Sequence, residues 1–130
     1  MKFVSLAGTF FFTAALTAPA FAQSVSVDLA NNLNEDDRTA FVDRYCAGEG
    51  SMANSIMVIR QSRKPMAEMI ADSVDQAASG EIDPETHAWI RSTIISAYDI
   101  SAYDTDEVKQ RVIADFSNDA TVACYRRFQQ

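Results

Sequence analysis

The sequence contains one histidine and two cysteines, and this scarcity excludes most metal and nucleophile chemistry. His87 has no second His or Cys at the spacing that zinc sites use, because neither H-x-x-x-H nor C-x-x-C-H occurs. The alternating D-x-D-x-D-G order of calcium loops is also missing. We therefore predict no metal, no cofactor and no catalytic residues, so the protein is not expected to be an enzyme.

Two weaker cofactor hypotheses need few residues. Met66 and Met69 could offer thioether sulfur to Cu(I), and His87 with one Met could hold a haem. The two methionines also have the spacing of a buried helical face, where Met commonly fills gaps. Packing therefore explains these residues without a cofactor.

Positive charge is the second shortage. There are 11 Lys and Arg against 18 Asp and Glu, which gives a formal net charge of −7. Such a surface repels phosphate backbones, so nucleic acid and anionic membranes are poor partners. Solubility is the simpler explanation of the acidity, and an acidic binding surface is the alternative.

A long hydrophobic run is also missing. The apolar run from Phe3 to Leu16 is shorter than the roughly 20 residues that span a bilayer, which argues against a retained membrane anchor. It follows Lys2 and precedes Ala20-Phe21-Ala22, a small-x-small cleavage site. We predict a signal peptide over residues 1–22, cleavage after Ala22, and a periplasmic or secreted mature chain without stable membrane insertion.

The two cysteines matter more in an exported protein, because oxidising compartments allow disulfides to form. Cys46 and Cys124 permit one intramolecular pairing. Two free thiols or a redox pair are the alternatives, but catalytic pairs usually stand as C-x-x-C. We predict a structural Cys46–Cys124 disulfide, worth about 4.5 kcal/mol in the chain-entropy model.

Helical periodicity dominates the mature chain, and no strand-like alternation of useful length occurs. Asn34, Asp83 and Thr105 are candidate N-caps, and Pro65 separates the first two helices. We predict an all-α fold with a flexible arm over 23–34 and a single domain over 35–130. The domain is an irregular four-helix array, with helices at about 36–63, 65–78, 84–99 and 105–127.

The sequence predicts three details of this array. The disulfide requires the first and last helices to lie antiparallel or to cross near Cys46. Gly48 and Gly50 mark either a bend or break in the first helix, or a place where a partner helix crosses closely. Trp89 is expected to supply the largest single piece of buried area.

A series of residue groups between Tyr45 and Tyr125 carries a resemblance. The groups are Cys46, Ala53, Ile56-Met57, Arg60-Gln61, Ala97-Tyr98, Lys109 through Ile113, Phe116 and Cys124-Tyr125. Their order resembles that of small exported two-cysteine helical bacterial proteins of uncharacterised function. The resemblance implies a helical fold and a family identity, and it supplies no activity.

Three classes of function stay open. A non-enzymatic binding or accessory protein of the cell envelope fits best, because each polar cluster has a structural explanation. An acid-responsive periplasmic chaperone is the first alternative, since its 18 carboxylates would be neutralised near about pH 4. A small hydrolase that uses carboxylates is the second alternative.

One concentrated positive spot stands out on the acidic chain. Arg60, Gln61, Arg63 and Lys64 follow one another closely at the end of the first predicted helix. Cations there also stabilise the helix dipole, which is the simpler reading. We predict that, if an unknown protein partner binds, it binds at this patch.

Overall fold

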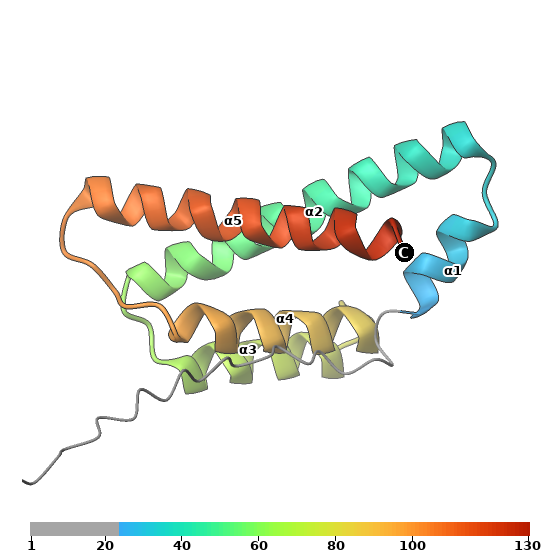
Figure 1. Ribbon diagram of the computed structural model, residues 1–130. Helices are drawn as coiled ribbons and strands as arrows, with labels where there is room; N and C mark the ends of the chain where they lie inside the picture. Colours follow the sequence, from blue (N-terminus) through green and yellow to red (C-terminus); the bar gives the residue numbers. More distant parts are fainter. Residues whose placement is uncertain (1–23) are drawn as a thin grey trace, which may run out of the picture.

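The computed structural model describes residues 24–130, which form five α-helices and no strand (Figure 1). The predicted signal peptide lies outside the described residues. The all-helical class is confirmed, and the four predicted helices are present with one addition at the N-terminus. The helices are α1 (Ser24–Asn31), α2 (Glu35–Gln61), α3 (Met66–Ala78), α4 (Pro84–Tyr98) and α5 (Asp106–Phe128).

Helix α1 occupies most of the segment that we expected to be a flexible arm. Its Ala30 is fully buried in a cluster with Val42 and Phe128, and Val27 packs against the same cluster. Val27 and Ala30 are three residues apart, so the helical conformation brings both to one side. The sequence of the arm is polar overall, and docking of these two side chains on α2 and α5 accounts for the difference.

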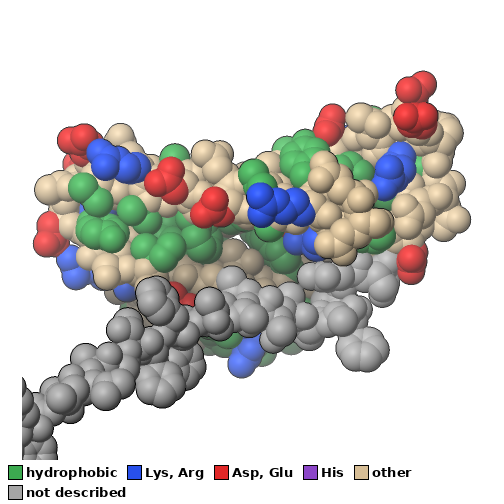
Figure 2. All heavy atoms as spheres, in the orientation of Figure 1, with side chains coloured by type: hydrophobic (Ala, Val, Ile, Leu, Met, Phe, Trp, Pro, Cys, Tyr) green, Lys and Arg blue, Asp and Glu red, His purple; other side chains and the backbone are tan. Residues whose placement is uncertain are grey.

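The helices form two layers (Figure 1). Helices α2 and α5 lie antiparallel in one layer, as the disulfide requires, and α3 and α4 lie antiparallel in the other. Hydrophobic side chains follow the side of the α2–α5 layer that faces α3 and α4 (Figure 2). The layers join through one core, made of Ile56, Met57, Met69, Ile90, Ile94 and Ala97.

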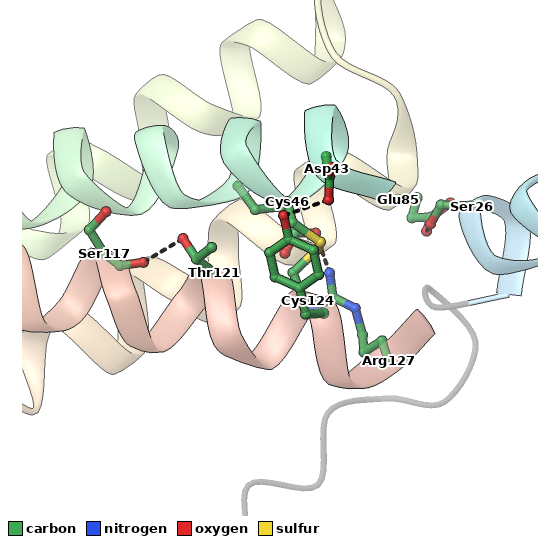
Figure 3. The surroundings of a disulfide bond; sticks show 10 residues. Ser26, Asp43, Cys46, Glu85, Ser117, Thr121, Cys124 and Arg127 are labelled. Atoms are coloured by element: carbon green, nitrogen blue, oxygen red, sulfur yellow. Dashed lines mark hydrogen bonds and ion pairs between the residues drawn. A yellow bond between two sulfur atoms is a disulfide. The ribbon is translucent and has the colours of Figure 1, made fainter. Parts of the chain in front are cut away.

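The disulfide is confirmed and anchors a second core at the other end of the α2–α5 pair (Figure 3). Cys46 and Cys124 are fully buried, and their Cα atoms are 5.4 Å apart. Aromatic rings close this end: Phe128 meets Phe41 and Tyr45 edge-on, at centroid distances of 6.2 and 5.6 Å. The covalent bond and the aromatic cluster thus stabilise the same end of the two long helices.

The two glycines of α2 have different surroundings, and the helix runs through both without a break. A Cβ atom on Gly50 would overlap Thr121 Oγ1 on α5, and Ser117 Oγ donates a hydrogen bond to the Gly50 carbonyl at 2.8 Å. Gly50 therefore marks the close crossing of α2 and α5. A Cβ atom on Gly48 would meet no atom within 4 Å among the described residues, so that side of α2 is open.

Side-chain caps explain where two helices begin. The Asn34 and Asp83 side chains accept hydrogen bonds from the backbone N–H groups of Asp37 and Thr86, as expected for N-caps. Thr105 occupies the N-cap position of α5 without such a bond. Within residues 24–130, no helix combines the length and apolar character that crossing a bilayer requires.

Candidate functional site

A cavity of about 250 Å³ lies between α2 and α4, and we call it the interlayer pocket. Its described lining residues are Arg44, Tyr45, Gly48, Glu49, Met52, Thr86 and Trp89. The space exists partly because Gly48 contributes no side chain at the wall. Trp89 borders this cavity and is partly buried, and its expected rank as the largest piece of buried area stays a prediction.

Glu49 is the unusual residue of the pocket wall, because its side chain is charged and only 8% exposed. Arg127 on α5 donates a hydrogen bond to Glu49 Oε1 and forms an ion pair with it. Glu49 Oε2 is buried and has no hydrogen-bond partner among the described residues. A buried carboxylate is costly unless its oxygens are satisfied, and Oε2 is a buried acceptor whose hydrogen-bonding capacity is unused among the described residues.

Tyr45 contributes an aromatic ring to the pocket wall, and its phenol is neutral. Its ring stacks on Phe41 at a centroid distance of 5.7 Å. Burial raises the pKa of Tyr45 above the ordinary value of 10.0, and the negative charges of Glu49 and Glu85 act in the same direction. The phenol therefore remains uncharged at neutral pH, and the pocket wall carries no phenolate.

Helix α1 connects the two layers beside the pocket. Ser26 Oγ donates a hydrogen bond of 2.9 Å to Glu85 Oε1 in the first turn of α4 (Figure 3). On its other side α1 contacts α2 and α5, where Ala30 is buried. The N-terminal helix therefore packs on the disulfide end of the α2–α5 layer and makes one hydrogen bond to α4.

These side chains define what the pocket can do chemically. Glu49 is the one carboxylate among its described lining residues, and no group of three His, Cys, Asp or Glu side chains within residues 24–130 is arranged to hold a metal. His87 Nε2 is buried without a described partner, but His87 does not line the pocket. The arrangement suits reversible binding of a small molecule through aromatic and thioether contacts and one carboxylate.

Two residues of the predicted partner patch hold the loop between α4 and α5. Gln61 is buried, and its side chain donates to the Ser101 carbonyl at 3.0 Å and accepts from the Tyr103 N–H at 2.9 Å. Arg60 Nε donates to the Ile100 carbonyl at 3.1 Å, and its guanidinium lies 4.6 Å from the centroid of the Tyr98 ring. Arg60 and Gln61 thus have a structural role at the end of α2.

The other two patch residues lie nearer the surface. Arg63 pairs with Asp104 at 2.5 Å, and Lys64 pairs with Asp72 at 2.5 Å. Arg63 has φ 68°, the left-handed conformation that often ends a helix, and it turns the chain from α2 toward α3. The patch lies at the C-terminal end of α2, whereas Cys46 lies near the middle of that helix, and its binding of a partner stays a prediction.

Sequence reasoning missed the pair of Glu49 and Arg127. A signal was present, because Glu49 stands three residues after Cys46 and three before Met52, on the apolar stripe of its helix. An acid at such a position is expected either to be buried with a partner or to bind a ligand. The partner of Glu49 could not be identified from the sequence, because Arg127 is one of several cations in the last turns of the helices.

Comparison of the chain with protein-family models, with curated proteins and with solved structures gives no match.

Proposed function

We propose that this chain is exported and acts as a non-enzymatic binding protein of the cell envelope, with the interlayer pocket as its binding site. The observation that carries the proposal is a cavity of about 250 Å³ with a buried carboxylate oxygen that lacks a described partner. Export is supported by the sequence of residues 1–22 and by the buried disulfide, since disulfides persist mainly outside the cytosol. The resemblance to small exported two-cysteine bacterial proteins points the same way.

The composition of the pocket favours binding over catalysis. Glycoside hydrolysis by carboxylates generally needs an acid and a second carboxylate as base or nucleophile. Glu49 is the one carboxylate among the described wall residues, and it is already paired with Arg127. A wall of this kind can hold and release a molecule without changing it.

Native mass spectrometry of the exported protein tests the proposal. The gene is expressed with its own N-terminus in a bacterial host that exports it, and the protein is purified without reductant. We expect an N-terminus at Gln23, an intact disulfide and a retained small molecule. A protein that keeps Met1, or that stays in the cytosol, would disprove export.

Two substitutions on neighbouring positions of α2 test the pocket. Gly48→Leu places a side chain at the pocket wall, and Ala47→Leu adds the same side chain at an equally exposed position that is not among the described lining residues. We expect Gly48→Leu to lose the retained molecule and Ala47→Leu to keep it. Equal retention by both variants would show that the pocket is not the binding site.

Of the patch Arg60, Gln61, Arg63 and Lys64, the three cations are proposed as the contact for a protein partner, since Gln61 is buried. Cross-linking in the native envelope, followed by purification, would identify a neighbour. Replacement of its three cations by Ala should abolish that cross-link, whereas Ala at the exposed Arg91, Arg111 and Arg126 should not. Unchanged cross-linking of the patch variant would refute this role.

A further inference from the structure

We infer that the interlayer pocket binds a small primary amine, with the ammonium group on Glu49 and the apolar body against Trp89 and Met52. The inference rests on the proposed binding function and names the ligand class of that site. Three features of the wall lead to an amine: its free hydrogen-bonding groups, its charge and its size.

Two of the lining residues, Glu49 and Thr86, bring an acceptor oxygen, beside the donors of Arg44, Tyr45 and Trp89. Glu49 Oε2 is buried and has no described partner, so the ammonium group reaches it through a shift of the Glu49 side chain within the wall, with Oε1 still paired to Arg127. Thr86 already donates its hydroxyl hydrogen to Asp83 Oδ2 at 2.6 Å, which leaves its oxygen as an acceptor. A ligand with donors and no acceptor is the complement of these two oxygens, and an ammonium group is such a ligand.

The charges around the pocket are expected to give an amine a higher affinity than an alcohol or a carboxylic acid. Arg127 occupies one oxygen of Glu49, so a cation at the other oxygen forms a charge-assisted hydrogen bond that an alcohol cannot match. The net charge of −7 attracts cations toward the protein. An anionic ligand would meet the carboxylate, and the one cation among the described lining residues, Arg44, is exposed to solvent.

The size and the aromatic wall define the body of the ligand. A cavity of roughly 150 Å³ holds a benzene ring, so about 250 Å³ accommodates a ring with a short arm. Trp89 and Tyr45 line the cavity, and aromatic faces attract cations as well as apolar groups. Met52 adds a flexible thioether that adapts to the shape of the ligand.

The experiment compares three probes of nearly equal size: 2-phenylethylamine, 2-phenylethanol and 3-phenylpropionate. Trp89 is the only tryptophan of the chain and lines the pocket, so its fluorescence reports occupancy directly. We expect the amine to bind about tenfold more tightly than the alcohol, because charge-assisted hydrogen bonds are roughly twice as strong as neutral ones. The carboxylate should leave the fluorescence unchanged.

Variants assign the preference to named residues. Glu49→Gln should remove the advantage of the amine over the alcohol, and Gln at the exposed Glu107 should preserve it. Gly48→Leu should abolish binding of both probes, with Ala47→Leu as its control. If Glu49→Gln does not fold, the preference of the wild-type protein among the three probes decides the matter.

Three results would overturn the inference. Equal affinities for amine and alcohol would show that the pocket does not select a cation, and an amine preference that survives in a folded Glu49→Gln protein would remove the role of Glu49. An unchanged Trp89 signal with every probe would overturn it as well. A retained native molecule that Gly48→Leu loses would still support the proposed binding function, so the two failures can be distinguished.

Discussion

Replacement of Gly50 by Ala tests the close crossing of α2 and α5. The added Cβ atom would overlap Thr121 Oγ1, whereas Thr121 Cβ and the Ser117 carbonyl oxygen would each lie 3.5 Å away, in ordinary contact. The variant can fold only if Thr121 rotates or the helices separate. Rotation breaks the hydrogen bond from Thr121 Oγ1 to the Ser117 carbonyl, and separation is resisted by the nearby disulfide.

Gly48 provides the matched control, because an added Cβ atom there meets nothing described within 4 Å. Both substitutions gain the helix propensity of Ala over Gly, about 1 kcal/mol. Only the Gly50 variant also loses stability through overpacking, typically about 1–3 kcal/mol. We therefore expect Gly48→Ala to stabilise the protein by about 1 kcal/mol and Gly50→Ala to be about 1–3 kcal/mol less stable than Gly48→Ala.

Urea unfolding followed by far-ultraviolet circular dichroism measures both values with the disulfide intact. The double variant Gly50→Ala with Thr121→Ala removes the overlapping oxygen, so its stability should return to that of Thr121→Ala or above. The reasoning fails if Gly50→Ala and Gly48→Ala agree within about 0.5 kcal/mol, the usual error of such comparisons. It also fails if shortening Thr121 gives no recovery.

Three further predictions concern other parts of the chain. Replacing both Cys46 and Cys124 by Ala opens a loop with a sequence separation of 78, which should cost about 4.5 kcal/mol in urea unfolding; a loss below about 1 kcal/mol would contradict a structural disulfide. Hydrogen bonds from Thr86 lower the pKa of Asp83 below 3.8, so this carboxylate stabilises the fold above about pH 4, and the contribution disappears as the pH falls through the lowered value. Asp83→Ala should therefore lose about 1 kcal/mol at neutral pH and less at low pH, where the protonated carboxyl still accepts a hydrogen bond, while Asp83→Asn keeps the cap; a loss that is the same at all pH values would refute this. Gln61→Ala should cost about 1–3 kcal/mol because it removes the two hydrogen bonds that the buried Gln61 side chain makes to Ser101 and Tyr103, against about 0–1 kcal/mol for the exposed Arg63→Ala, and equal losses in thermal unfolding would disprove the anchoring role.

Much of the fold could be predicted because its signals are local. The N-caps Asn34 and Asp83 and the break at Pro65 lie next to the helix ends that they determine. The pairing of Cys46 with Cys124 could be predicted without a structure, because the sequence contains no other cysteine. Helix α1 could not be predicted in this way, because Val27 and Ala30 gain burial only from α2 and α5.

The sequence by itself determined the helical class, the bounds of the four main helices and the covalent link between the first and last of them. The tertiary structure decided which glycine lies at a helix crossing and which lies at a cavity, since Gly48 and Gly50 are equivalent in local sequence terms. It also joined Glu49 to Arg127 and left one carboxylate oxygen without a described partner. The physical reason is that periodicity and capping act within a few residues, whereas a pocket and a buried ion pair depend on where separate helices are held in space.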